Sequence, residues 1–184
     1  ARQQQNVVAQ MVEKNRDMLF SDAGSPRIGA EKPALTLVYF TDYNCVFCKK
    51  FEADITTLLK AYPQVAVVIK PLPYRAESSL SSARLALTVW NQQPKNFLKL
   101  HEMLMTKKGN HDEASISAAL KKTGITLAAP DKASLDTINH NLTLAQQLGV
   151  QGTPATLVGN QLISGAVPYA QLEAAVKDAL KAAP

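Results

Sequence analysis

The stretch Tyr43-Asn44-Cys45-Val46-Phe47-Cys48-Lys49-Lys50 holds both cysteines of the chain, one helical turn apart. Residues 35–40 just before it (Leu-Thr-Leu-Val-Tyr-Phe) are apolar and rich in β-branched and aromatic side chains, which predicts a buried strand. Apolar residues then recur at helical spacing, at Phe51, Ile55, Leu58 and Leu59. The two cysteines therefore lie where a strand turns into a helix.

This position favours ionisation of a thiol. A helix N-terminus offers free backbone N–H groups and the positive end of the helix dipole, and both stabilise a thiolate. Cys-X-X-Cys sites at helix N-termini lower the thiol pKa from about 8.5 to roughly 3.5–7.5. The dipole alone supplies about 0.3–1 kcal/mol, so a large shift also requires hydrogen bonds to the sulfur. We expect Cys45, exposed at the turn, to be the nucleophile and Cys48, one turn deeper, to resolve the mixed disulfide.

A Cys-X-X-Cys pair can also be half of a zinc site or an inert structural disulfide. A structural zinc site takes four ligands, and the three histidines (His101, His111 and His140) show no paired spacing. Two cysteines confined to one motif favour a catalytic pair over a disulfide-stapled scaffold. We therefore prefer the redox interpretation and expect neither a metal nor a cofactor.

A second motif lies far downstream, in residues 148–158 (Leu-Gly-Val-Gln-Gly-Thr-Pro-Ala-Thr-Leu-Val). A turn that leads through Thr153-Pro154 into an apolar strand, after an upstream Cys-X-X-Cys, resembles the thioredoxin superfamily. The resemblance implies a cis Thr153–Pro154 bond that lies against the active-site sulfurs, and an X-Pro bond needs only about 0.5–1 kcal/mol to become cis. Such a loop can pair with an extended peptide as a sheet edge does. The alternative is an ordinary turn before a strand.

Composition limits the other functions. The 184 residues suffice for one domain with an insertion or a small appendage, and no apolar run is long enough to cross a bilayer. The chain carries a net charge of +5, but its basic residues are dispersed and aromatic residues make up only 6%. We therefore expect no nucleic-acid partner. The opening residues, Ala1-Arg2-Gln3, fit a processed secretory protein.

Residues 3–20 contain neither glycine nor proline and predict one helix. A line of residues at heptad spacing (Val8, Met11, Asn15 and Met18) runs along it, with a polar asparagine at an a position. Two interpretations stay open: the helix packs on its own domain, or it is an oligomerisation element that binds a second copy. Residues 21–33 are dense in turn formers and predict a linker. We therefore divide the chain into residues 1–30 and a domain of residues 31–184.

The remaining pattern predicts an α/β fold. Residues 65–70 form a second buried strand, so strand, helix and strand make a βαβ unit with parallel strands. Four consecutive helices are expected within an insertion of about residues 75–148, with Asp112 and Asp131 as caps and Gly124 and Gly149 at helix ends. Strands resume at 155–158 and 162–163, and a last helix opens around residue 168. The fold class is a thioredoxin fold with an inserted helical domain and an N-terminal helical extension.

This order of elements, with Thr-Asp-Tyr-Asn-Cys-X-X-Cys-Lys at 41–49 and Gln-Gly-Thr-Pro-Ala at 151–155, resembles the DsbA-like branch of the thioredoxin superfamily. Within it, the N-terminal helix and both motifs are most similar to a group of bacterial copper-tolerance proteins. The resemblance covers nearly the whole chain. It implies a periplasmic thiol–disulfide oxidoreductase that acts on unfolded or misoxidised secreted proteins and is reset by a membrane redox partner. It also implies self-association through the N-terminal segment.

The sequence departs from the DsbA-like pattern at two places. Val46-Phe47 stands between the cysteines instead of the Pro-His of strong oxidases or the Gly-Pro of thioredoxin reductants. Tyr39 stands six residues before the first cysteine, where DsbA-like proteins commonly carry a buried acid. The first change affects thiolate stability and therefore the redox poise. The second should alter the pH dependence of exchange, since a buried carboxylate can relay protons.

The leading hypothesis is an envelope enzyme that exchanges disulfides through a mixed disulfide at Cys45. Thr153 and an oligomerising helix favour an isomerase or reductase over an oxidase. We expect substrate to be bound by Val46, Phe47, Thr153 and Pro154. The alternative is a Cu(I)-binding copper-tolerance protein, because two adjacent thiolates suit Cu(I), although the chain lacks stretches rich in Met or His. A redox-inactive chaperone is a third alternative, which the intact motif disfavours.

Overall fold

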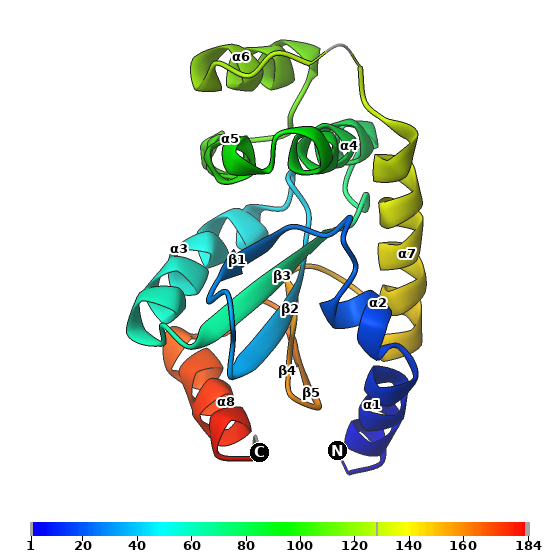
Figure 1. The fold of residues 1–184 in the computed structure, drawn as a ribbon, viewed down its shortest axis with the longest axis vertical. Helices are drawn as coiled ribbons and strands as arrows, with labels where there is room; N and C mark the ends of the chain where they lie inside the picture. Colours follow the sequence, from blue (N-terminus) through cyan, green and yellow to red (C-terminus); the bar gives the residue numbers. More distant parts are fainter. Residues whose placement is uncertain (1, 128, 183–184) are drawn as a thin grey trace.

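A five-stranded sheet lies between two layers of helices in the computed structural model, which describes residues 2–127 and 129–182 (Figure 1). The strands are β1 (Arg27–Gly29), β2 (Leu35–Thr41), β3 (Val65–Pro71), β4 (Ala155–Val158) and β5 (Gln161–Ser164). Their order in the sheet is β1-β3-β2-β4-β5. The pair β2·β3 is parallel, as the βαβ prediction requires, and the other pairs are antiparallel. The thioredoxin-type α/β fold predicted from the sequence is confirmed.

Both faces of the central strands are buried, which explains their continuous apolar sequences. Successive side chains of β2 point to opposite faces. Leu37 and Tyr39 join a cluster with α3 (Val46–Ala61) and α8 (Tyr169–Ala182) on what we call the α3 face. Val38 and Phe40 join a second cluster with α1 (Arg2–Lys14), α2 (Arg16–Phe20) and α7 (Lys132–Leu148), on what we call the α7 face.

The inserted helices lie at one end of the sheet (Figure 1). They are α4 (Glu77–Gln92), the 3₁₀ turn η1 (Pro94–Asn96), α5 (Phe97–Thr106), α6 (Glu113–Thr123) and α7 (Lys132–Leu148). The predicted caps are confirmed: Asp112 accepts the Ser115 N–H at 2.7 Å, and Asp131 accepts the Ser134 N–H at 2.8 Å. The last of these helices, α7, runs back along the sheet, so the insertion both extends the fold and covers one face.

The N-terminal segment differs from its prediction. The expected single helix is interrupted at Asn15, which separates α1 (Arg2–Lys14) from α2 (Arg16–Phe20). The Asn15 side chain donates to the Met11 carbonyl at 2.8 Å and to Gln147 Oε1 of α7 at 2.6 Å. An amide that bonds its own backbone competes with the helical ladder, which accounts for the break.

The helix face predicted for self-association lies against the chain's own domain. Val8 is buried in the α7-face cluster, and Met11 and Met18 pack against that cluster from its edge. This arrangement supports the intramolecular interpretation of the N-terminal helices. Self-association through the same face stays a prediction, and it would require these helices to leave α7.

Residues 21–33, predicted as a linker, contain the edge strand β1. It pairs antiparallel with β3, with Arg27 opposite Val68. Gly29 adopts a φ of +95°, and a Cβ there would lie 2.5 Å from the Val65 carbonyl oxygen, so this turn requires glycine. A strand of three residues is too short to show an alternating pattern in the sequence. The domain boundary proposed at residue 30 therefore separates β1 from the sheet to which it belongs.

Across residues 2–127 and 129–182, no helix combines the length and apolarity that a membrane span needs.

Candidate active site at the junction of β2 and α3

Cys45 is the N-cap residue of α3, directly after the turn that follows β2. Its backbone is extended, with φ −83° and ψ +119°, while its carbonyl accepts the Lys49 N–H at 3.0 Å. Its sulfur accepts the Cys48 N–H at 3.4 Å. A sulfur therefore occupies the place that an oxygen side chain takes at most helix N-termini, as predicted.

This position lowers the pKa of Cys45 to about 5. The largest cause is a hydrogen bond from the Cys48 thiol, and burial acts in the opposite direction. Hydrogen bonds from Thr153 and from the backbone N–H groups of Phe47 and Cys48 lower the pKa further. Cys45 is therefore largely ionised at neutral pH.

Cys48 has the opposite character. It is fully buried, and burial raises its pKa well above the usual range of a thiol, with the hydrogen bond to Cys45 as the next cause. Both residues are free cysteines. The pair thus consists of an ionised nucleophile and a protonated partner that can resolve a mixed disulfide.

The structure corrects one expectation about Cys45. We expected an exposed residue, yet only 2% of its surface is accessible. Its Sγ lies 3.4 Å from the Thr153 carbonyl oxygen, so the second motif covers it. The two residues that follow are instead exposed, Val46 by 50% and Phe47 by 57%. The apolar rim, rather than the sulfur, is the part of the site that faces solvent.

The second motif meets the first as the resemblance implies. The Thr153–Pro154 peptide bond is cis, and Pro154 is buried beside β4. A groove of about 310 Å³ lies along this loop, lined mainly by Gly149, by residues 151–155, and by Ser164 and Gly165 at the end of β5. Gln4 of α1 also lines it, which the sequence did not indicate.

A buried polar cluster holds the turn before Cys45. The Asp42 carboxylate accepts the backbone N–H groups of Asn44 (2.8 Å), Tyr74 (3.0 Å) and Arg75 (2.9 Å) and the Ser79 hydroxyl (2.7 Å). These bonds tie the end of β2 to the start of α4. Sequence reasoning missed Asp42 because three of its four partners, Tyr74, Arg75 and Ser79, lie more than thirty residues downstream.

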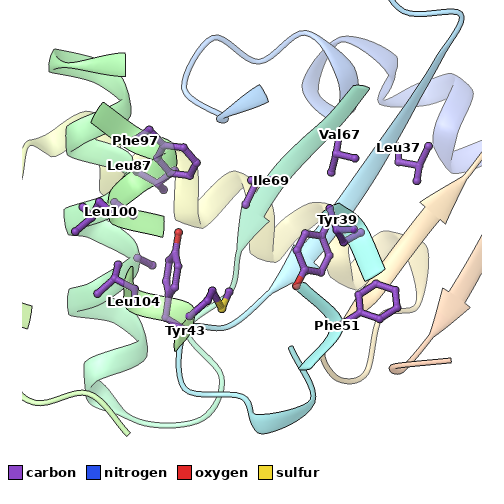
Figure 2. Packing of buried hydrophobic residues seen from close by; sticks show 14 of the residues in the cluster. Leu37, Tyr39, Tyr43, Phe51, Val67, Ile69, Leu87, Phe97, Leu100 and Leu104 are labelled. Carbon is purple, nitrogen blue, oxygen red and sulfur yellow. The ribbon is translucent and has the colours of Figure 1, made fainter. Parts of the chain in front are cut away.

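A second polar cluster lies beneath the cysteines, on the α3 face. Glu52 follows Cys48 by one helical turn, and its Oε1 accepts from His101 Nε2 of α5 at 2.7 Å. His101 Nδ1 in turn pairs with the Tyr43 hydroxyl at 2.7 Å. Figure 2 shows Tyr43 among Leu87, Leu100 and Leu104 of the inserted helices, with Tyr39 beside Phe51 of α3. The spacing to Cys48 could have indicated Glu52, whereas nothing in the sequence indicated His101.

No group of three or more His, Cys, Asp or Glu side chains that could hold a metal ion occurs among the described residues. The soft ligands available at the site are the two sulfurs themselves.

Comparison with known proteins agrees with this geometry. A family model described as a DSBA-like thioredoxin domain matches residues 36–177. Among curated proteins, disulfide bond formation protein D of Bacillus subtilis (strain 168) is 23% identical over 175 residues, which cover 86% of this chain and 78% of the relative.

Solved structures are more similar. A periplasmic thioredoxin-like protein from Salmonella enterica serovar Typhimurium is 52% identical, with a TM-score of 0.88 over 90% of this chain and 95% of that one. The catalytic domain of Proteus mirabilis ScsC, a suppressor of copper sensitivity, is 47% identical, with a TM-score of 0.91 over 94% and 98% of the two chains. The resemblance to a copper-tolerance group is therefore confirmed.

Proposed function

This chain belongs to the family of DSBA-like thioredoxin-domain proteins, which are thiol–disulfide oxidoreductases, and from that premise we propose that it is an isomerase or reductase of disulfides in secreted proteins. The observation that carries the proposal is the Cys45 sulfur at the start of α3, with its pKa lowered to about 5. A thiolate that exists at neutral pH attacks disulfides, and this attack is the step that isomerases and reductases need first.

The chemistry follows from the two thiols. The Cys45 thiolate attacks one sulfur of a substrate disulfide, forms a mixed disulfide and releases the other substrate sulfur as a thiolate. In reduction, Cys48 then attacks Cys45, the intramolecular disulfide forms, and the substrate leaves with both sulfurs reduced. In isomerisation, a second substrate thiol displaces Cys45 instead, and the site ends as it began.

Features around the sulfur support binding of an unfolded peptide. Val46 and Phe47 offer an exposed apolar rim, and Thr153 presents its backbone next to Cys45. A peptide joined to Cys45 can pair with that backbone as an added strand and continue into the groove beside Pro154. Catalysis is thereby assigned to Cys45 and Cys48, and substrate binding to Val46, Phe47, Thr153 and Pro154.

We assign the protein to the periplasm, because the Salmonella neighbour is a periplasmic protein. An oxidising compartment supplies substrates that carry wrong disulfides. A membrane partner would return the pair to its reduced form after each reduction. Self-association through Val8, Met11, Asn15 and Met18 would place several such sites on one substrate.

Refolding of scrambled ribonuclease tests the proposal. Wild type should restore ribonuclease activity, and Cys45→Ser should not. Rapid oxidation of reduced ribonuclease without recovery of scrambled enzyme would instead identify an oxidase, the direction that the name of the Bacillus relative suggests. The reduction potential of the Cys45–Cys48 couple gives an independent measure, since oxidants lie near about −120 mV and reductants near about −270 mV.

The second candidate function is Cu(I) binding by the same two sulfurs. It is favoured by the hydrogen bond between the Cys45 and Cys48 thiols, which places two soft ligands side by side. Titration with Cu(I) under anaerobic conditions separates the two functions. A copper carrier should bind Cu(I) tightly and turn over no disulfide, whereas an exchange enzyme should regain full activity once copper is removed.

A further inference from the structure

Four lysines lie on two segments that meet beside the thiol pair. Lys49 and Lys50 follow Cys48 directly on α3, and Lys107 and Lys108 lie in the loop between α5 and α6. None of the four forms an ion pair with a carboxylate in the part of the chain that the structure describes. Their positive charges are therefore not neutralised by the protein itself.

The loop between α5 and α6 is tied to the start of α3. The Lys49 ammonium donates to the carbonyl oxygens of Lys107 and Gly109, the latter at 2.7 Å, just beyond the C-terminal end of α5. Asn44, in the turn before α3, makes a second tie, because its Oδ1 accepts the His111 N–H at 2.7 Å. The loop and its lysines therefore have a fixed position next to the nucleophile.

Backbone carbonyl groups hold the charges of this loop without neutralising them. Lys107 Nζ donates to the carbonyl oxygens of Asn110 at 2.5 Å and of Lys108 at 3.0 Å. An ammonium group has three donors, so Lys49 and Lys107 each retain one donor beyond these two bonds. The charge of Lys107, after burial itself, lowers the pKa of Lys49, which agrees with two ammonium groups close together. Like charges with free donors bind a carboxylate well.

The neighbouring acid Asp112 is engaged elsewhere. Its carboxylate accepts the Ser115 N–H at 2.7 Å as the cap of α6. That hydrogen bond is the main cause of its lowered pKa, and the charge of Lys107 contributes less. The lysines of the loop thus remain available to a carboxylate from another molecule.

An apolar patch adjoins these charges. Val46 and Phe47 are both exposed, and Lys50 Nζ lies 6.0 Å from the centroid of the Phe47 ring. A peptide whose cysteine is joined to Cys45 can pair with the backbone of Thr153. It therefore meets an apolar surface at its cysteine and cationic groups beside it.

We propose that Lys49, Lys50, Lys107 and Lys108, which we call the cationic rim, select extended substrate segments in which acidic side chains flank the disulfide cysteine. The inference rests on the proposed function, because it concerns the peptide that forms the mixed disulfide with Cys45. An acidic segment complements the rim in charge, and a basic segment is repelled by it. The rim acts mainly on the rate of encounter, and salt weakens its effect.

Short peptides that differ only in flanking charge test the rim. Each carries a central cysteine activated as a 2-pyridyl disulfide and flanked by glutamates, glutamines or lysines. The Cys45 thiolate attacks the cysteine sulfur of the peptide, the S–S bond of the reagent breaks, and pyridine-2-thione leaves with the electron pair and takes up a proton. With wild type at low salt, the glutamate peptide should react about 10-fold faster than the glutamine peptide, and the lysine peptide should react slowest. The difference should largely disappear at about 0.5 M salt.

A double variant of the two exposed lysines locates the effect. Lys50→Gln with Lys108→Gln removes two charges of the rim and leaves the side chains of Lys49 and Lys107 on their carbonyl groups. The ratio of the glutamate rate to the glutamine rate should fall about 3-fold. This ratio is the quantity to measure, because a change in the reactivity of the thiolate affects both rates and cancels.

Lys60→Gln with Lys181→Gln is the matched control, since it removes the same charge far from the thiols. Lys60 lies about four turns further along α3, and Lys181 lies in the last turn of α8, at the opposite end of the molecule from the insertion (Figure 1). The ratio should stay at its wild-type value in this control. Equal rates for the three peptides with wild type, or an equal fall of the ratio in both double variants, would overturn the selection and leave the proposed function intact. If reduced wild type reacts with none of the peptides, the proposed function fails, and the selection with it.

Discussion

Tyr39 and Thr41 on one face of the central sheet and Lys70 on the other are buried equally deeply, yet their surroundings differ. On the α3 face, the Thr41 hydroxyl donates to the Tyr39 hydroxyl at 3.1 Å, and the Tyr39 hydroxyl donates to the Cys48 carbonyl oxygen at 3.4 Å. On the α7 face, the Lys70 ammonium donates to the Met18 carbonyl at 3.0 Å and to the Ser25 hydroxyl at 2.9 Å. The first set lies against the turn of α3 that carries Cys48, and the second fixes the N-terminal segment on the sheet.

The alternation of a strand explains how adjacent residues acquire such different tasks. Tyr39 and Phe40 of β2 point to opposite faces, as do Ile69 and Lys70 of β3. The α3 face leads to the sulfurs, while the α7 face receives the N-terminal helices. The comparison implies that polar changes on the α3 face reduce exchange, whereas polar changes on the α7 face reduce stability and leave the thiols alone.

The largest effect is expected at the sulfurs themselves. Cys48→Ala removes the resolving thiol while Cys45 remains able to attack, so covalent adducts with scrambled ribonuclease should accumulate. Non-reducing electrophoresis and mass spectrometry measure them. Cys45→Ala is the matched control and should form none. Adducts on Cys48 in that control would reverse the assignment of nucleophile and resolving residue.

A large loss of stability is expected where β2 ends. Asp42→Asn replaces one of two carboxylate oxygens that accept four donors, and hydrogen bonds to a charged group contribute about 1.5–3 kcal/mol each. The free energy of unfolding should fall by about 2–4 kcal/mol in urea titrations. Asp112→Asn, at the exposed cap of α6, should cost less than about 1 kcal/mol, since asparagine also caps helices well. Equal losses in the two variants would contradict the role given to Asp42.

The parts of the fold that the sequence predicted are those set by local signals. Residues 155–158 match β4 fully, and Asp112 and Asp131 cap their helices as expected. The thiol pair was predictable because a strand, a turn and a helix adjoin in sequence. Each of these features depends on neighbours a few residues away.

What the sequence could not predict depends on distant neighbours. β1 forms only because β3 offers it an edge, and the Asn15 side chain finds its second acceptor in Gln147 of the distant helix α7. The sequence suggests that Cys45 is exposed, because it does not show that Thr153 covers the sulfur. His101 resembles any histidine on an apolar helix until Glu52 and Tyr43 are placed on either side of it.

The charge of Lys70 gives the α7 face a pH dependence of its own. Burial lowers the pKa of Lys70 to about 8, against about 10.4 in an unfolded chain. Between these values the unfolded state binds more protons, so stability rises with pH, by about 3 kcal/mol in total. The unfolding free energy of wild type should therefore rise by that amount relative to that of Lys70→Met from pH 8 to about 10.5.

Lys132→Met, at an exposed lysine of α7, should show no such growth. Exchange rates in Lys70→Met should match wild type, because this lysine faces away from the sulfurs. A pH-independent difference in stability, or a slower reaction of Cys45 with the thiol reagent DTNB, would contradict the division between the two faces.

The smallest expected effect concerns the docking of α1. Asn15 Nδ2 and Gln147 Oε1 are 2.6 Å apart, and a neutral hydrogen bond of this kind contributes about 0.5–1.5 kcal/mol. A double-mutant cycle of Asn15→Ala and Gln147→Ala should therefore give a coupling energy of about 1 kcal/mol in unfolding experiments. If α1 instead serves mainly to bind a second copy, the coupling should vanish, and Asn15→Ala should change the mass measured by light scattering. Contacts of this size, together with the hydrogen bonds of Lys70, hold the N-terminal helices on the α7 face. The cycle therefore measures how strongly α1 is bound to α7.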